Sequence, residues 1–202
     1  MTDFKTQSKA AFNKQAPTYD QDQNGCHARS LYPALLARLS AIPYDTALDL
    51  GCGTGEVMRL ILQQNQEKSL YGIDLSENML EIARAKLPDQ VSLYLGDSEH
   101  LPFPDSFFDV VYCNDSFHHY PAPSRVLSEV CRVLKPQGIF LICDTWHTQP
   151  GRTLINFLFK HSKGGDVKLY SEREMRSLFS PCFSQVTWER LGHSGCMTVG
   201  VK

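Results

Sequence analysis

Between residues 45 and 143, short apolar or β-branched runs alternate with segments whose apolar residues recur at helical spacing. This alternation is typical of βαβ units, in which crossover helices join parallel strands. The runs are mostly continuously apolar, which favours strands covered by helices on both faces of a sheet. Five strands are predicted, at Thr46–Leu50, Leu70–Asp74, Val91–Leu95, Phe108–Cys113 and Gly138–Cys143.

The segments between these runs contain signals for helix ends. Ser76 is placed to cap a helix that must end before Pro88. Ser124 similarly predicts the start of a second helix. That helix is followed by Lys135–Gly138, where Pro and Gly suit the second and fourth positions of a type I turn.

The C-terminal end has a different pattern. Gln185–Leu191 and Cys196–Val201 are strand-like runs separated by four residues that begin and end with glycine. So short a link predicts an antiparallel hairpin. The fold class is therefore α/β, a doubly wound, mostly parallel seven-stranded sheet with an antiparallel C-terminal hairpin.

A length of 202 residues suffices for one domain with a sizeable core. We expect a single domain at 1–202. Its parts are an N-terminal helical cover at 1–40, a ligand-binding core at 41–144, a segment at 145–170 that could form a lid over a substrate, and a C-terminal helix and hairpin at 171–202.

Composition excludes several classes of protein. With 20 basic and 22 acidic residues and a net charge of -2, the chain lacks the basic patch that nucleic-acid binding needs. No apolar run is long enough to span a membrane, and the polar N-terminus does not resemble a signal peptide, so we expect a cytoplasmic protein. Seven scattered cysteines without a Cys-x-x-Cys pair predict reduced thiols and no metal site. The oligomeric state stays open.

A glycine-rich loop, Asp49–Gly55, follows the first predicted strand and precedes a helix. At this place a ligand can meet both bare backbone and a helix N-terminus, although the glycines could also form only a tight turn. The next residue is Glu56, where a dinucleotide fingerprint has Gly or Ala. A carboxylate there repels a pyrophosphate, which disfavours a nicotinamide oxidoreductase and favours a ligand without phosphates.

A second acidic position follows the second predicted strand. Asp74 lies about twenty residues beyond the glycine loop, where a carboxylate can accept hydrogen bonds from both hydroxyls of a ribose. The same residue could instead cap the helix that starts near Ser76. The first interpretation predicts a ligand that contains a nucleoside.

Five segments in order resemble the successive motifs of class I S-adenosylmethionine-dependent methyltransferases. They are Leu48–Gly55, Gly72–Ser76, Gly96–Ser98, Leu101–Asp109 and Arg132–Gly138. Within that superfamily the chain is most similar to the small-molecule branch that includes the ubiquinone and menaquinone C-methyltransferases. Phe12–Asp20 also resembles the N-terminal segment of that branch. The resemblance implies S-adenosylmethionine as cofactor and a small-molecule acceptor.

The resemblance also implies which residues hold the methionine part of the cofactor. The backbone of Gly51, Cys52 and Gly53 would line it, with Asp49 nearby. Asn114, after the fourth strand, would lie near the methionine amine. A sulfonium and an ammonium group fit an acidic environment better than a pyrophosphate does.

For the nucleoside part, the resemblance implies a second set of residues. Asp74 would hold the ribose, while Leu75 and Met79 would pack against adenine. Asp97 would accept a hydrogen bond from the exocyclic amine, with Ser98 beside it. From the N-terminal segment, Tyr19 would close over the cofactor.

Methyl transfer depends mainly on positioning and on excluding water, and a base is needed only when the acceptor must lose a proton. Candidate bases after the fourth and fifth strands are Asp115, His118, His119 and His147. We prefer His119 as the catalytic residue. The alternative is that the His118–His119 pair only packs the helix that follows it.

Three other functions stay open at this stage. Asn114–Phe117 lacks the Asn-Pro-Pro-Tyr motif of many nucleic-acid and protein amino-methyltransferases, which favours a small-molecule acceptor but does not exclude an RNA or protein substrate. A non-catalytic, regulatory module that binds S-adenosylmethionine would retain the same pocket. A nicotinamide oxidoreductase is disfavoured by Glu56.

Overall fold

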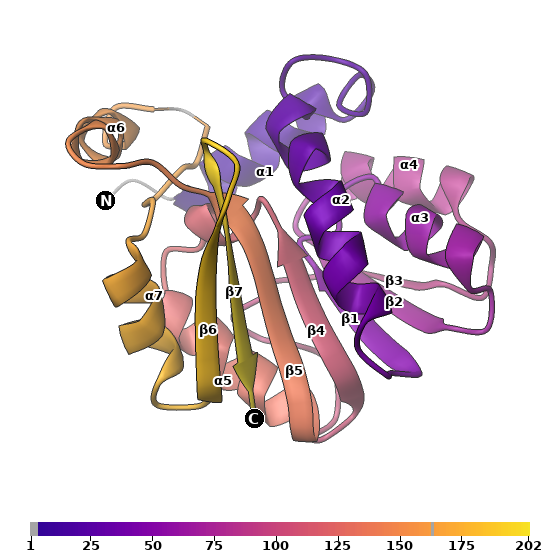
Figure 1. Ribbon diagram of the computed structural model, residues 1–202. Coiled ribbons are helices and arrows are strands. Elements are labelled where there is room, and N and C mark those ends of the chain that lie inside the picture. The colour runs from indigo at the N-terminus through magenta and orange to yellow at the C-terminus, as the bar shows by residue number, and fades with distance from the viewer. Residues whose placement is uncertain (1–3, 163) are drawn as a thin grey trace.

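The computed structural model describes residues 4–162 and 164–202 of the chain. Seven strands form one sheet in the order β3-β2-β1-β4-β5-β7-β6 (Figure 1). Strands β1 to β5 pair in parallel, whereas β7 is antiparallel to both β5 and β6. The predicted fold class is confirmed, including the antiparallel hairpin at the C-terminal end.

The strands lie close to their predicted positions. Their bounds are β1 Thr46–Leu50, β2 Ser69–Asp74, β3 Ser92–Leu95, β4 Phe108–Asn114, β5 Leu134–Thr145, β6 Ser184–Leu191 and β7 Gly195–Val201. The largest difference is β5, which begins four residues early. The predicted type I turn at Lys135–Gly138 is wrong, because Gln137 has φ of 64° and a type I turn needs a negative φ at its third position.

The helices are α1 Phe4–Gln15, α2 Cys26–Ser40, α3 Glu56–Gln64, α4 Glu77–Lys86, α5 Pro123–Val133, α6 Gly151–Phe159 and α7 Glu172–Phe179, with a short 3-10 helix η1 at Phe117–His119. Ser76 caps α4 as predicted, since its side chain accepts from the Met79 amide. Ser124 does not cap α5. Pro123 is already the first residue of that helix and fixes the helical φ there.

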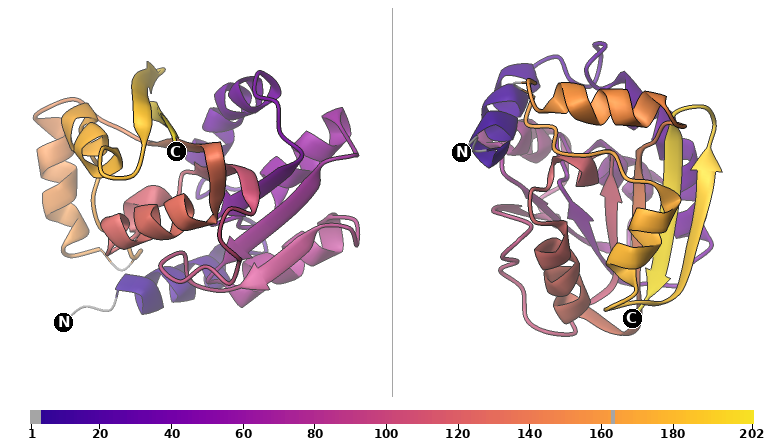
Figure 2. Two further views of the ribbon diagram at one scale, coloured as in Figure 1. Left: turned by 90° about the horizontal axis from the view of Figure 1, so that it is seen from below. Right: turned by 90° about the vertical axis from the view of Figure 1, so that its left-hand side faces the viewer.

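Helices cover both faces of the sheet (Figure 2). On one face, α2 and α3 pack against the strands through residues such as Leu35 and Met58. On the other face, α5 and α7 do so through residues such as Val130 and Phe179. Side chains of β1 alternate between the two cores, and this alternation places Asp49 on the same face as α2 and α3.

Two helices lie outside these layers, and both appear at the top of Figure 1. They are α1, from the predicted cover at 1–40, and α6, from the predicted lid at 145–170. Residues 1–3 and 163 of those two segments lie outside the described residues. Leu154, Phe157 and Leu158 of α6 are exposed. Within residues 4–162 and 164–202, no helix combines the length and the apolar character needed to cross a membrane.

Candidate cofactor and acceptor site

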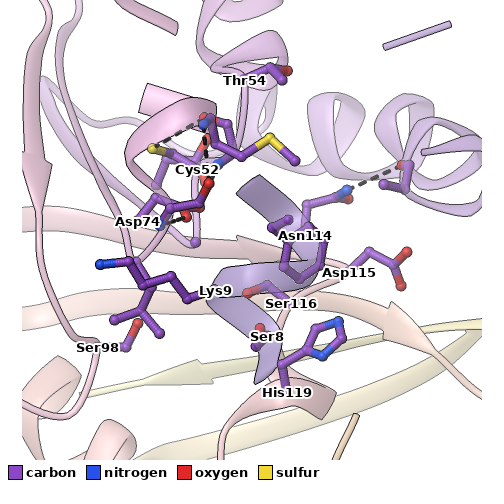
Figure 3. A pocket seen from close by; sticks show the side chains of 18 of the residues that line it. Ser8, Lys9, Cys52, Thr54, Asp74, Ser98, Asn114, Asp115, Ser116 and His119 are labelled. Atoms are coloured by element: carbon purple, nitrogen blue, oxygen red, sulfur yellow. Dashed lines mark hydrogen bonds between the residues drawn. The ribbon is translucent and has the colours of Figure 1, made fainter. Parts of the chain in front are cut away.

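A pocket with about 950 Å³ of empty space, part of it open to solvent, lies at the carboxyl ends of the parallel strands. The structure brings all twelve sequence-predicted site residues to its wall. They are Tyr19, Asp49, Gly51, Cys52, Gly53, Asp74, Leu75, Met79, Asp97, Ser98, Asn114 and His119. Figure 3 labels Cys52, Asp74, Ser98, Asn114 and His119 among them. Open α/β sheets bind ligands at this edge, where loops from several strands meet.

The glycine loop is hydrogen-bonded to the end of β2. The amides of Gly51 and Cys52 both donate to the Ile73 carbonyl, at 2.9 and 3.1 Å. Gly51 has φ of 76°, and a Cβ added there would lie 2.2 Å from the Ser116 Oγ. A residue without a side chain is therefore required at this point, and the backbone that follows lies exposed to the pocket.

Asp74 organises this loop with both carboxylate oxygens. Oδ2 accepts from the Gly53 amide and Oδ1 from the Ser76 amide, each at 2.8 Å. Burial raises the pKa of Asp74, and these backbone hydrogen bonds oppose that shift. Asp74 can therefore both support the start of the helix after Ser76 and accept from a ribose, because a carboxylate fixed in this way keeps lone pairs for further donors.

At the methionine end of the pocket, two buried oxygens lack a partner. They are Asp49 Oδ2 and Asn114 Oδ1. Asp49 is only 2% exposed, and burial raises its pKa to about 8, helped by the nearby charge of Asp74. The amide of Asn114 is fixed by donation from Nδ2 to the Ala28 carbonyl at 3.1 Å. An ammonium group would satisfy both oxygens, so these residues fit the methionine end of S-adenosylmethionine.

The nucleoside end combines apolar and acidic groups. Met79 is buried in the pocket wall, as is Ser98. Asp97 forms an ion pair with Lys5 of α1 at 2.6 Å and also accepts from the Glu99 amide at 2.9 Å. Sequence reasoning missed the Lys5 contact, because it joins residues 92 positions apart.

Helix α1 covers the pocket through further contacts. Lys9 pairs with Glu77 at 2.5 Å, and Asn13 Oδ1 accepts from the Ser76 hydroxyl at 2.6 Å. The Phe12 ring lies edge-on to the rings of Tyr19 and His119, at centroid distances of 6.0 and 5.1 Å. Among the described residues, none after Pro121 lines the pocket, so the predicted lid segment at 145–170 is not part of its wall.

Glu56 lies in the pocket wall but has its own partners. Its two carboxylate oxygens pair with Arg59 at 2.6 Å and Lys86 at 3.0 Å. The hydrogen bond from Arg59 is the main reason that the pKa of Glu56 is lowered. Because two cations neutralise this carboxylate, it repels a phosphate less than the sequence indicated.

On the acceptor side of the pocket, Asp115 is held by two groups that sequence reasoning missed. His27 Nδ1 lies 2.9 Å from Asp115 Oδ1, and the Thr145 hydroxyl donates to the same oxygen at 2.8 Å. The hydrogen bond between His27 and Asp115 raises the pKa of His27. Burial would raise the pKa of Asp115, but His27 holds it below its ordinary value. Only the folded chain brings α2, β4 and β5 together here.

The adjacent histidines differ in environment. Burial would lower the pKa of His118, but Asp144, 2.5 Å from Nδ1, helps to raise it to about 9. Burial and the positive charge of His118 lower the pKa of His119 to about 4. His119 therefore lines the pocket as a neutral ring, with Nδ1 buried and unpartnered. His147, the fourth candidate base, does not line the pocket.

Comparison with known proteins agrees with this geometry. Residues 48–142 match the family model of a methyltransferase domain. The demethylmenaquinone methyltransferase of Lactobacillus johnsonii is 34% identical over 71% of this chain. Residues 48–142 are the core of a class I methyltransferase domain. The chain spans 62% of the length of that curated relative.

Solved structures share the fold of this methyltransferase domain. A chain of the complex between the Haloferax volcanii Trm112 methyltransferase activator and a methyltransferase has a TM-score of 0.80 at 24% identity, over 96% of both chains. Phosphoethanolamine N-methyltransferase 2 of Haemonchus contortus, solved with S-adenosylmethionine, has a TM-score of 0.74 at 16% identity, over 93% of this chain and 59% of that one.

Proposed function

We propose that the chain transfers a methyl group from S-adenosylmethionine to a small-molecule acceptor. The observation that supports this most is a pair of buried oxygens without a hydrogen-bond partner, Asp49 Oδ2 and Asn114 Oδ1, whose residues both line the pocket. A buried acidic group without a partner costs free energy unless a ligand pairs with it, and a cationic amino acid end is such a ligand. The same pocket offers Asp74 and Asp97 for the nucleoside end.

When bound, S-adenosylmethionine supplies an electrophilic methyl group on its sulfonium. In the proposed reaction, Asp49 and Asn114 hold the amine while Asp74 holds the ribose. Helix α1, fixed by Lys5 and Lys9, excludes water from this part of the pocket. In-line transfer then requires the acceptor to be positioned, which the chain can do without a strong base.

The proposed acceptor is a small molecule with an apolar or aromatic body. Phe12, Tyr19 and Tyr32 line the pocket, and its polar groups beyond the cofactor residues include Asp115 and His119. A net charge of -2 disfavours nucleic acid, and the Lactobacillus johnsonii relative is described as a demethylmenaquinone methyltransferase. Seven free cysteines fit a reducing cytoplasm, where we propose that the protein acts.

Incubation with methyl-labelled S-adenosylmethionine tests the proposed activity. We expect protein-dependent labelling of a quinone or phenol from a panel that also contains charged amines, carboxylic acids, RNA and protein. Labelling of RNA or protein alone would replace the small-molecule assignment. Tight binding of the cofactor with no labelled product from any acceptor would instead support a regulatory module.

The catalytic residue that we propose is His119. Its neutral ring lines the pocket, so the ring can contact an acceptor there, whereas Nδ1 is buried on the side of Asp166. With its pKa near 4 it is a weak proton acceptor, and we assign it a positioning role at the acceptor more than a strong base role.

His119→Asn should lower kcat by about 10- to 100-fold, the range expected for loss of one aligned polar group at an acceptor. The affinity for S-adenosylmethionine should stay within about threefold, because the ring lies apart from the cofactor residues. Steady-state rates and calorimetry measure the two effects. His147→Asn is the matched control and should retain the wild-type rate. An unchanged kcat in His119→Asn would remove this residue from the mechanism.

A further inference from the structure

Beside the acceptor end of the pocket, two histidines and a carboxylate converge from distant parts of the sequence. His118 and His119 belong to η1, and Asp166 belongs to the loop after α6. Asp166 Oδ1 lies 3.7 Å from His118 Nε2 and 3.8 Å from His119 Nδ1. One ligand atom from each of the three residues lies within 4.8 Å of the others.

These separations are too long for hydrogen bonds, but they suit ligands around an ion. Zinc–nitrogen and zinc–oxygen bonds are about 2.1 Å, so the ligand atoms of a tetrahedral site lie roughly 3.4 Å apart. Two of the three separations, 3.7 and 3.8 Å, are within a few tenths of an ångström of that spacing. The three ligand types, two imidazoles and one carboxylate, are those of known catalytic zinc sites.

The two nitrogens of His118 have separate partners. Nδ1 lies 2.5 Å from Asp144 Oδ1, which fixes the ring and leaves Nε2 directed at Asp166. Metal-binding histidines typically donate their second nitrogen to a carboxylate in this way. Asp144 thus has the position of an outer partner, itself fixed by donation from the Thr145 amide at 2.8 Å.

His119 provides an independent reason to expect a ligand. Its side chain is 11% exposed, and Nδ1 is buried without any hydrogen-bond partner. Leaving a buried polar atom unsatisfied costs free energy, on the order of 1–3 kcal/mol. An ion between His119 and Asp166 would satisfy this nitrogen without a rotation of the ring.

Asp166 is held in place by its surroundings. Its Oδ2 accepts from the Ser162 hydroxyl at 3.0 Å, which leaves Oδ1 directed at the histidines. The next two amides, of Val167 and Lys168, both donate to the His118 carbonyl, at 2.9 and 3.1 Å. The carboxylate and the histidines therefore belong to one fixed unit before any ion binds.

We propose that His118, His119 and Asp166 bind a divalent transition-metal ion of the zinc class. Three protein ligands leave a fourth position for an oxygen or nitrogen of another molecule. Because His119 lines the methyl-transfer pocket, that molecule would be the acceptor, and this consequence alone rests on the proposed function. The ion would polarise an acceptor hydroxyl. His119 would then bind the ion and would not contact the acceptor directly.

Zinc titration of the untagged full chain, freed of metal with a chelator, tests the site without any cofactor present. We expect about one zinc per chain with a Kd in the micromolar range or below, and no comparable binding of Mg²⁺. Asp166→Asn and His119→Asn should each weaken binding by about tenfold or more, whereas His147→Asn should bind zinc like the wild type.

Thermal unfolding gives a second readout. Saturating zinc should raise the Tm of the wild type and of His147→Asn, and not that of Asp166→Asn. Equal zinc affinity in the wild type and both ligand variants would overturn the proposal. So would a wild type that binds no zinc at micromolar concentration. Neither result depends on S-adenosylmethionine, so failure of the metal site would leave the proposed methyl transfer standing.

Discussion

Asp74→Ala should bind S-adenosylmethionine about 100-fold more weakly than the wild type, or worse. The half-buried Asp74 lies at the end of β2, and its carboxylate is the group that we propose accepts from both ribose hydroxyls. Hydrogen bonds to a charged group contribute about 1.5–3 kcal/mol each, so the loss of two corresponds to at least two orders of magnitude in Kd. Calorimetry with S-adenosylmethionine and its demethylated product measures the effect.

The same substitution also removes the acceptor for two amides, those of Gly53 and Ser76. Part of the lost affinity could therefore come from a disturbed loop. Asp74→Asn separates the two contributions, because its single carbonyl oxygen retains one acceptor without the charge. We expect its affinity to fall between those of the wild type and Asp74→Ala, with a Tm closer to the wild type. Affinity of Asp74→Ala within twofold of the wild type would refute the ribose role.

Asp49→Asn should have opposite effects on stability and on cofactor binding. Burial raises the folded-state pKa of Asp49 from 3.8 to about 8. Between these values the folded protein keeps a proton that the unfolded chain has lost, so the free energy of unfolding falls as pH rises through this window. The Asn side chain does not titrate and avoids this loss. The variant should be more stable than the wild type by roughly 2–4 kcal/mol near pH 8.

Denaturant unfolding at pH 5 and pH 8 measures this difference. The gap between the variant and the wild type should be small at the lower pH, where Asp49 is protonated in the folded protein, and should grow toward pH 8. A gap that does not change with pH would show that Asp49 does not titrate in this window.

Cofactor binding should change in the other direction. Asp49→Asn removes the negative charge that we propose pairs with the methionine amine, so S-adenosylmethionine should bind about 10- to 100-fold more weakly at pH 8. Asp109→Asn offers a matched control, since Asp109 lies in the core strand β4 but does not line the pocket. A variant that is both more stable and unimpaired in binding would contradict the role of Asp49.

The sheet and many residues of the pocket wall were predictable because the signals lie within short stretches of sequence. The glycine loop after β1 and Asp74 after β2 are each placed by the strand that precedes them, since parallel strands all end at one edge. The motif resemblance then supplied the roles. Where the local signal was weaker, as at Ser124 and Lys135–Gly138, the prediction failed, because Pro123 and Gln137 determine the backbone there.

The polar clusters around the acceptor end were not predictable in the same way. His27 and Asp115 meet across 88 positions, and His118 and Asp144 across 26. No short pattern signals such pairs, because each depends on how a loop or covering helix packs against the sheet. The prediction that the chain has no metal site considered only ligands at short spacing, and no short pattern in the sequence pairs His119 with Asp166.

Helix α1 contacts both ends of the pocket at once. Lys5 pairs with Asp97 and Glu99 at the nucleoside end, at 2.6 and 2.7 Å. On its other side, the backbone of Ser8 packs against Gly165, where an added Cβ would lie 2.5 Å from the Ser8 nitrogen. A ligand that moves the loop around Asp166 must therefore also move this helix. If zinc at Asp166 and a ligand at Asp97 both shift this helix, each must change the affinity of the other by the same factor.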